Sequence, residues 1–347
     1  MLALDKLKLI GKQTLKIESK PRIISAFSVV GPKEGDGPLK DYFDLILDDD
    51  LNGEDSYEKA ESTLLYTSIT ESIKKAKLKP QDINFLFAGD LLNQIISSTF
   101  AARDLEIPFI GLYGACSTMT ESLCMASITM DGGFAKNVIA ATSSHFSAAE
   151  RQFRYPLEFG NQRPPTAQWT VTGSGSMVLA REGNYPYITY VTIGKVKDYG
   201  IKDANNMGAA MAPAAVSTIY RHFKDTGRTP QDYDLIATGD LGKIGREITQ
   251  KLLKEYGYDM YSNYIDCGEE IFDNERQKTD SGGSGCGCSA VVASGYIYKN
   301  MRKGKFKRVL LVSTGALLST TSSLQGESIP GIAHAVSIEY GTGGDEA

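Results

Sequence analysis

The sequence predicts an α/β protein made of two similar halves. Two features lead to this prediction. Apolar runs rich in Val, Ile and Phe alternate with segments of helical period along the 347 residues, as in sheets that are buried between helices. In addition, residues 80–91 recur at 230–241 with six of twelve residues identical, which indicates an internal repeat.

The first half alternates between strand and helix patterns. In chain order, we expect a strand at 27–31, a helix over 56–76, a strand at 83–89, a helix over 91–105, a strand at 107–115 and a helix after Cys116. In the last of these, Leu123, Ala126 and Met130 recur at helical spacing. Asp131 and the two glycines after it are expected to end that helix.

The second half follows the same order. An amphipathic segment at about 209–226 precedes the repeated turn and strand, just as 55–77 precedes the first copy. A strand is expected at 309–318.

A weaker similarity extends the repeat, because 132–144 resembles 302–315 in the register that sets Lys136 opposite Lys307. This register places Cys116 opposite Gly287. We therefore divide the chain into an N-terminal half, 1–185, and a C-terminal half, 186–347. Their corresponding helix-opening turns are expected to meet at a shared site.

The composition excludes several classes of protein. A formal net charge of −5 and a pI near 5.4 argue against a nucleic-acid partner. The first 20 residues alternate Lys with Leu and Ile and lack the apolar run of a secretion signal, and no segment is apolar enough to span a membrane. Membrane association is therefore expected to be peripheral. Five irregularly spaced cysteines without a C-x-x-C pair indicate reduced thiols and no metal site.

Cys116 is the first candidate functional residue. In GACSTMTES it follows the strand pattern IPFIGLYGA and precedes a helix, so it is expected at a strand-to-helix turn together with Ser117. The unpaired N–H groups of a helix N-terminus stabilise a thiolate or a ligand oxyanion. Cys116 is therefore either a nucleophile or part of a binding site, and the competing interpretation is a small buried cysteine in a tight turn.

Several motifs together resemble the thiolase superfamily, especially its ketoacyl synthase III branch: GACSTMTES, TVTGSGSMVL at 170–179, SGGSGCGCSAVVASGY at 281–296 and the two-half repeat. The resemblance covers most of the chain and implies a thiolase-like fold with layers in the order αβαβα. ERQFRYP and GGSGCGCSAVV are not general thiolase signatures, and with AGDLLNQ and ATSSHFSAAERQFRYP they resemble a narrower family of proteins from spore-forming bacteria.

The thiolase resemblance implies a Cys nucleophile, which Cys116 matches, and two partners from the second half that this sequence lacks. A His is expected near the end of the strand at 234–238, and an Asn or His in the Gly-rich turn, but neither is present. General acid–base help and an oxyanion donor together lower a barrier by about 5–9 kcal/mol. We therefore expect a binding protein on an enzyme scaffold, with no catalytic residues, no cofactor and Cys116 as a vestigial nucleophile.

The narrower resemblance implies a ligand and partners. The ligand would be dipicolinic acid (pyridine-2,6-dicarboxylate), alone or as its calcium chelate, taken up into the developing spore. The chain would be a homodimer and a peripheral component, with other stage V sporulation channel proteins, at the spore inner membrane. A flat aromatic dianion suits two facing helix N-termini and an arginine fork.

The other candidate ligand-binding residues come from motifs near these turns. Arg151 and Arg154 offer bidentate donors for a carboxylate. Asp90 and Asp240 each follow a Gly at a helix start, where an N-cap carboxylate is the competing interpretation. The remaining candidates are Asn93, His145, Gly285, Cys286, Gly287 and Cys288.

Two alternatives stay open at this stage. The chain could be an acyl-CoA-dependent condensing enzyme in which His145 or another base assists Cys116. It could also be a scaffold whose former active site binds nothing.

Overall fold

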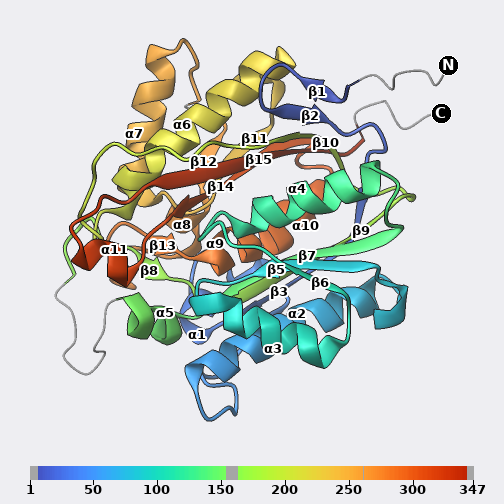
Figure 1. Ribbon diagram of the computed structural model, residues 1–347, viewed down its shortest axis with the longest axis horizontal. Helices are drawn as coiled ribbons and strands as arrows, with labels where there is room; N and C mark the ends of the chain where they lie inside the picture. The colour runs from blue at the N-terminus through green and yellow to red at the C-terminus, as the bar shows by residue number, and fades with distance from the viewer. Residues whose placement is uncertain (1–6, 154–162, 261, 342–347) are drawn as a thin grey trace.

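The computed structural model describes residues 7–153, 163–260 and 262–341. Figure 1 shows five layers, in which two mixed sheets enclose a central layer of helices and each sheet carries further helices on its outer face. The prediction of a thiolase-like αβαβα fold with two similar halves is confirmed.

The first sheet is formed by the N-terminal half, in the order β3-β9-β7-β5-β6. Its strands are β3 (Arg22–Val30), β9 (Gly173–Ala180), β7 (Asn137–Ser144), β5 (Phe85–Gly89) and β6 (Phe109–Gly111). Its outer face carries α2 (Tyr57–Lys75) and α3 (Ile96–Leu105), while α4 (Thr118–Asp131) covers the inner face.

The second sheet has the order β10-β15-β14-β11-β12, which repeats the arrangement of the first. Its strands are β10 (Tyr187–Thr192), β15 (Gly331–Glu339), β14 (Arg308–Ala316), β11 (Leu235–Thr238) and β12 (Tyr264–Asp266). The outer face carries α6 (Met207–Thr226) and α7 (Gly242–Glu255). On the inner side, α9 (Cys286–Val292) continues through a π-helical turn (Ala293–Ile297) into α10 (Tyr298–Arg302).

The repeat in the sequence therefore corresponds to a repeat of strand order. A single pair, Tyr187 with Arg22, joins the two sheets between β10 and β3. Which residue divides the halves stays a prediction, placed at 185/186.

Smaller elements complete the fold. They are β1 (Leu9–Ile10), β2 (Thr14–Lys16), α1 (Pro32–Gly35), β4 (Leu45–Ile46), α5 (Phe146–Phe153), β8 (Trp169–Thr170), α8 (Cys267–Ile271), β13 (Gly283–Ser284) and α11 (Thr320–Leu324), with 3-10 turns at Lys40–Tyr42, Pro80–Asp82, Asn93–Ile95 and Pro230–Asp232. The pair β8 and β13 is important for the site, because it joins a loop of each half in parallel.

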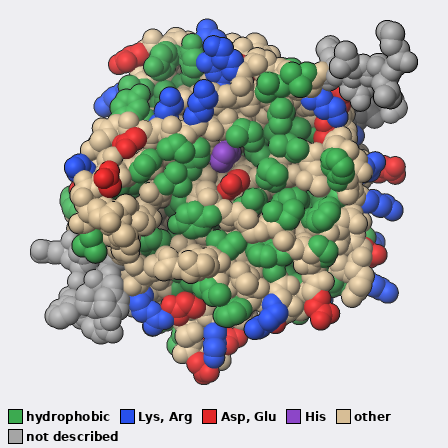
Figure 2. All heavy atoms as spheres, viewed as in Figure 1, with side chains coloured by type: hydrophobic (Ala, Val, Ile, Leu, Met, Phe, Trp, Pro, Cys, Tyr) green, Lys and Arg blue, Asp and Glu red, His purple; other side chains and the backbone are tan. Residues whose placement is uncertain are grey.

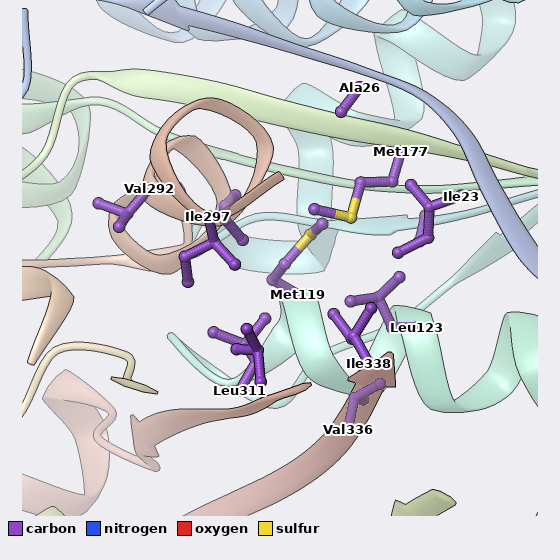
Figure 3. Packing of buried hydrophobic residues seen from close by; sticks show 14 of the residues in the cluster. Ile23, Ala26, Met119, Leu123, Met177, Val292, Ile297, Leu311, Val336 and Ile338 are labelled. Atoms are coloured by element: carbon purple, nitrogen blue, oxygen red, sulfur yellow. The ribbon is translucent and has the colours of Figure 1, made fainter. Parts of the chain in front are cut away.

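The main core lies between the two sheets. Figure 3 shows Met119 and Leu123 of α4 packed toward Met177 of the first sheet and toward Val336 and Ile338 of the second. All of these side chains are at most 2% exposed. The helix that follows Cys116 is thus held on both sides, and this fixes the turn at its beginning.

Two predicted elements differ from the structure. The strand expected at 107–115 is ordered as a strand only over β6, because the chain then turns toward α4. The helix expected over 91–105 begins at Ile96, because Gln94 and Ile95 adopt left-handed backbone angles. These two residues turn the chain before the helix starts.

Candidate functional site

A small cavity of about 40 Å³ lies where loops of the two halves meet, at the ends of β8, β13 and β14. Most of its wall is apolar, with Tyr113, Thr170 and Ser284 as the hydroxyl-bearing residues and Cys116 as the thiol. The lining residues are Leu91, Tyr113, Ala115, Cys116, Ala149, Phe153, Thr170, Met207, Ser284, Ala316 and Leu318.

Cys116 occupies the strand-to-helix turn that the sequence predicts, between β6 and α4. Ala115 adopts a left-handed conformation, with φ of +49°, and Cys116 is 6% exposed. Gly315 of β14 packs against this turn so closely that a Cβ atom there would lie 2.2 Å from the carbonyl oxygen of Gly114. Only glycine allows that approach of the two halves.

Ser117 is fully buried and does not line the cavity. Its Oγ donates a hydrogen bond of 2.7 Å to the carbonyl oxygen of Gly114, within the same turn. In this arrangement the Ser117 side chain stabilises the turn.

Asp240 lies beneath the cavity wall and is 1% exposed. Its Oδ1 accepts a hydrogen bond from Thr314 Oγ1 at 2.7 Å. Its Oδ2 accepts from Ser284 Oγ at 2.9 Å and from the N–H of Gly285 at 3.1 Å. The carboxylate therefore ties β14 to the Gly-rich turn, directly behind a residue of the cavity wall.

The competing interpretation of Asp240, as an N-cap carboxylate for α7, is wrong. The N–H groups of Leu241 and Gly242 donate instead to Asp266, each at 2.9 Å. Because Asp266 supplies this cap from the end of β12, the Asp240 side chain is available to the site.

The surroundings of Cys116 disfavour a thiolate. Burial, followed by the negative charge of Asp240, raises the pKa of the Cys116 thiol well above its usual range. These effects outweigh the stabilisation of a thiolate by the helix N-terminus, so the thiol is neutral near pH 7 and is a weak nucleophile. Its Sγ lies 3.9 Å from Ser284 Oγ.

The Gly-rich turn is not an open anion cradle. The N–H of Gly285 donates to Asp240, and the N–H of Gly287 donates to Ser144 Oγ at 3.0 Å. Cys286 and Cys288 are fully buried, and their thiols donate to the carbonyl oxygens of Ala115 at 3.0 Å and Gly239 at 3.3 Å. The N–H of Gly285 in this turn thus binds a carboxylate oxygen, but that oxygen belongs to Asp240 of the same chain.

His145 does not face the cavity. Its Nε2 lies 2.8 Å from the carbonyl oxygen of Asp50, and its Nδ1 accepts from the N–H of Ser147 at 3.2 Å. Burial lowers the pKa of His145, so the ring is neutral. The structure therefore does not bring His145 to Cys116 as a base.

Asp90, Asn93 and Arg151 lie beside the cavity rather than in its wall. Asp90 is buried and accepts from the N–H of Leu92 at 2.8 Å and of Ser98 at 2.7 Å, so it caps the first turn of α3. Asn93 and Arg151 line a neighbouring groove.

Arg151 forms an ion pair with Glu58, to which Nε donates at 3.2 Å and Nη2 also donates. The guanidinium is thus engaged with a carboxylate of the same chain. Arg154, the other predicted arginine, lies outside the described residues.

The sequence analysis missed the three hydroxyl-bearing residues of the wall. Thr170 and Ser284 lie within motifs that were recognised, TVTGSGS and SGGSGCGC, but their exposure to the cavity follows from the pairing of β8 with β13. Tyr113 precedes the cysteine turn in IGLYGA, and burial raises its pKa, which keeps the hydroxyl protonated as a donor.

The cavity wall combines apolar surface with a few polar groups. The wall offers apolar surface for a ring, and the hydroxyls of Tyr113, Thr170 and Ser284 offer polar contacts. Within the described parts of the chain, no lining residue is a Lys, Arg or His, and no group of three or more His, Cys, Asp or Glu could hold a metal ion. None of the described helices is long and apolar enough to cross a membrane.

Comparison with known families gives a match over nearly the whole chain. A family model described as stage V sporulation protein AD (SpoVAD) matches residues 11–339. Stage V sporulation protein AD of Bacillus subtilis (strain 168) is 49% identical over 337 residues, which cover 97% of this chain and 99% of that protein.

Solved structures with the same fold are more distant in sequence. The 3-oxoacyl-[acyl-carrier-protein] synthase III from Aquifex aeolicus VF5 has a TM-score of 0.59 at 12% identity, over 92% of this chain and 100% of that one. OleA from Xanthomonas campestris with cerulenin has a TM-score of 0.61 at 12% identity, over 96% and 98% of the two chains. At these identities the likeness establishes the fold alone.

Proposed function

The chain belongs to the stage V sporulation protein AD family, and from this we propose that it binds dipicolinic acid without catalysing a reaction. The ligand site would be the cavity at Cys116. In this role the protein takes part in uptake of dipicolinic acid into the developing spore, as a peripheral component of a channel complex at the spore inner membrane.

The observation that carries the proposal is the position of Asp240 close to Cys116. A buried carboxylate, Asp240, lies behind Ser284 and adds to the effect of burial, which raises the pKa of the Cys116 thiol. A condensing enzyme needs a base or an oxyanion donor at this point, and a carboxylate opposes both the thiolate and the oxyanion. The cavity is therefore better suited to binding than to acyl transfer.

The shape and chemistry of the wall also support an aromatic acid as ligand. A pyridine ring would pack on apolar side chains such as Leu91, Ala149 and Phe153. Carboxylate oxygens would accept hydrogen bonds from the hydroxyls of Tyr113 and Thr170.

The charge of Asp240 bears on the form of the ligand. Burial raises the pKa of Asp240, and its ionised form behind the wall repels a free dianion but not a neutral chelate. We therefore favour the calcium chelate, in which two positive charges of the ion cancel the two carboxylates.

Calorimetric titration tests this function. Dipicolinate should bind more tightly with calcium than without it, and benzoate should bind far more weakly than the calcium chelate. Thr170→Val removes a wall hydroxyl with little change of shape and should weaken binding about tenfold. Thr321→Val on the exposed helix α11 is the matched control and should bind like the unmodified protein. Absent binding, or equal binding of benzoate, would refute the proposal.

The second candidate is an acyl-CoA-dependent condensing enzyme. It is favoured by one observation, namely that the Cys116 thiol lines the cavity at the start of a helix in a ketoacyl-synthase-like fold. Intact-mass spectrometry after incubation with acetyl-CoA or malonyl-CoA distinguishes the two functions. A covalent acyl adduct that is lost in Cys116→Ser, together with formation of a ketoacyl product, would establish the enzyme.

We also propose a homodimer. Figure 2 shows hydrophobic side chains spread over the face that carries α4, while most charged side chains lie around its rim. At the outer edge of the first sheet, Ile110 of β6 is 42% exposed, and Tyr113 just after it is 46% exposed. An apolar sheet edge of this kind suits pairing with a second copy. Light scattering should give twice the chain mass, and Ile110→Glu should shift it toward the monomer.

A further inference from the structure

A second groove with a different chemistry lies at the opposite end of β14. Four cations line it, namely Lys75 at the end of α2 and Lys299, Arg302 and Lys303 of the α10 segment. The rest of the wall comes from 24–26 of β3 and from Tyr185 and Tyr298, so no lining residue carries an acid.

The cations come from an unusually basic part of an acidic chain. Residues 298–308 contain six Lys or Arg and no Asp or Glu, although the whole chain has 42 acids against 37 Lys and Arg. These residues belong to α10, the loop after it and the start of β14, and Figure 1 shows α10 behind α4 in the central layer. Three of them, Lys299, Arg302 and Lys303, line the groove.

Two of the four cations are fixed by a buried acid. The Asp44 carboxylate forms ion pairs with the ammonium groups of Lys75 at 2.8 Å and Lys299 at 2.9 Å. The Asp44 side chain is only 9% exposed. Lys299 also donates to the carbonyl oxygen of Tyr42 at 2.6 Å. These contacts hold two positive charges in place at one side of the groove and leave the groove with an excess of positive charge.

The other two cations have no carboxylate partner among the described residues. Arg302 donates through Nη1 to the carbonyl oxygen of Asn184 at 2.6 Å and to the Tyr340 hydroxyl at 3.2 Å, and its guanidinium lies 4.5 Å from the Tyr185 ring centre. Lys303 is exposed and lies 5.8 Å from the Tyr42 ring centre. An oriented guanidinium and a nearby ammonium group thus point to an anion as their partner.

We propose that this groove binds a phosphate group, either on a lipid headgroup or on a soluble molecule. A phosphate carries several acceptor oxygens, which several cations can contact at once, and the planar guanidinium of Arg302 matches its geometry. Clusters of four or more Lys and Arg at one surface are also typical of binding to anionic lipids.

The position of the groove separates it from the ligand cavity. Arg308 begins β14 beside the basic segment, and Ala316 ends it in the cavity wall. The groove and the cavity share no lining residue. Occupation of the basic groove therefore leaves the cavity near Cys116 accessible, and this inference does not depend on the function proposed for that cavity.

The test compares Arg302→Ala/Lys303→Ala with the unmodified protein. Vesicles with about 30 mol% phosphatidylglycerol in phosphatidylcholine should bind the unmodified protein at low salt, and binding should fall as salt screens the charges. Loss of two cations should weaken binding about 30-fold. The matched control, Lys243→Ala/Lys251→Ala on α7, removes the same charge from another exposed surface and should bind like the unmodified protein.

Titration with inorganic pyrophosphate distinguishes the two sources. Vesicle binding that is lost in the groove variant, without pyrophosphate binding, supports a lipid headgroup. Pyrophosphate binding that is lost in the same variant supports a soluble phosphate. The proposal is overturned if the unmodified protein binds neither probe, or if the groove variant binds as well as the control. Circular dichroism melting of both variants verifies that they are folded.

Discussion

Replacing Asp240 with Asn should make Cys116 more reactive. The two side chains share a neighbour, because Ser284 Oγ lies 3.9 Å from the Cys116 Sγ and 2.9 Å from the Asp240 Oδ2. Sulfur and carboxylate are therefore no more than about 7 Å apart. At that distance and an effective dielectric constant of about 20, one negative charge opposes the thiolate by about 2.4 kcal/mol.

This energy corresponds to about 50-fold more thiolate at a given pH once the charge is removed. A thiolate of lower pKa is intrinsically less nucleophilic, so only about half of this free energy appears in the rate. Alkylation below both pKa values should therefore be about 7–10 times faster in Asp240→Asn.

Intact-mass spectrometry during reaction with iodoacetamide at constant pH measures this rate, and peptide mapping assigns it to Cys116. Cys116→Ser should abolish the fast reaction. Ser284→Ala removes the shared hydroxyl but keeps the charge, so it controls for a mere opening of the cavity. An unchanged or lower rate in Asp240→Asn would refute the electrostatic explanation, as would an equal increase in Ser284→Ala.

Three further changes test other parts of the structure. Burial raises the pKa of Glu34 to about 8, so the folded protein prefers the protonated carboxyl. As the pH rises from the unfolded pKa to pH 8 this form is lost, and the free energy of unfolding should fall by about 4 kcal/mol. Thermal melting at pH 5 and pH 8 should show a smaller fall in Glu34→Gln than in the unmodified protein. Gly315→Ala places a Cβ atom 2.2 Å from the Gly114 carbonyl oxygen. Denaturant unfolding should show a loss of stability of about 1–3 kcal/mol. Calorimetry should show weaker dipicolinate binding. Leu123→Ala in the fully buried central layer should cost about 2–5 kcal/mol in the same unfolding assay, and a cost below 1 kcal/mol would contradict the packing described.

The fold could be predicted because its signals are local and repeated. The apolar periods that define α2 and β5 lie within single segments, and the similarity of 80–91 to 230–241 relates the halves without any knowledge of contacts. The turn at Cys116 is of the same kind, because a strand pattern, a Gly and a helical pattern follow one another directly.

The site was predicted less completely because its contacts join distant segments. Ser284 is 44 residues and Thr314 is 74 residues from Asp240, and nothing in the sequence around Asp240 indicates these partners. A Gly-Asp before a helix predicts an N-cap, and that prediction is wrong here because Asp266, from another strand, takes the role. Arg151 was a reasonable anion ligand by residue type, but its distance from the cavity depends on Glu58, which is 93 residues away.

The Asp side chains of the two Gly-Asp segments of the repeat have different roles in the two halves. In the first half, left-handed residues at Gln94 and Ile95 delay the helix, and Asp90 is used to cap it through the N–H of Ser98. In the second half, the helix starts at once and Asp266 caps it, which leaves Asp240 free to reach across to Ser284. The same dipeptide therefore stabilises a helix in one half and determines the electrostatics of the cavity in the other. The difference arises from the capping partner that each half supplies, since the two carboxylates themselves are alike.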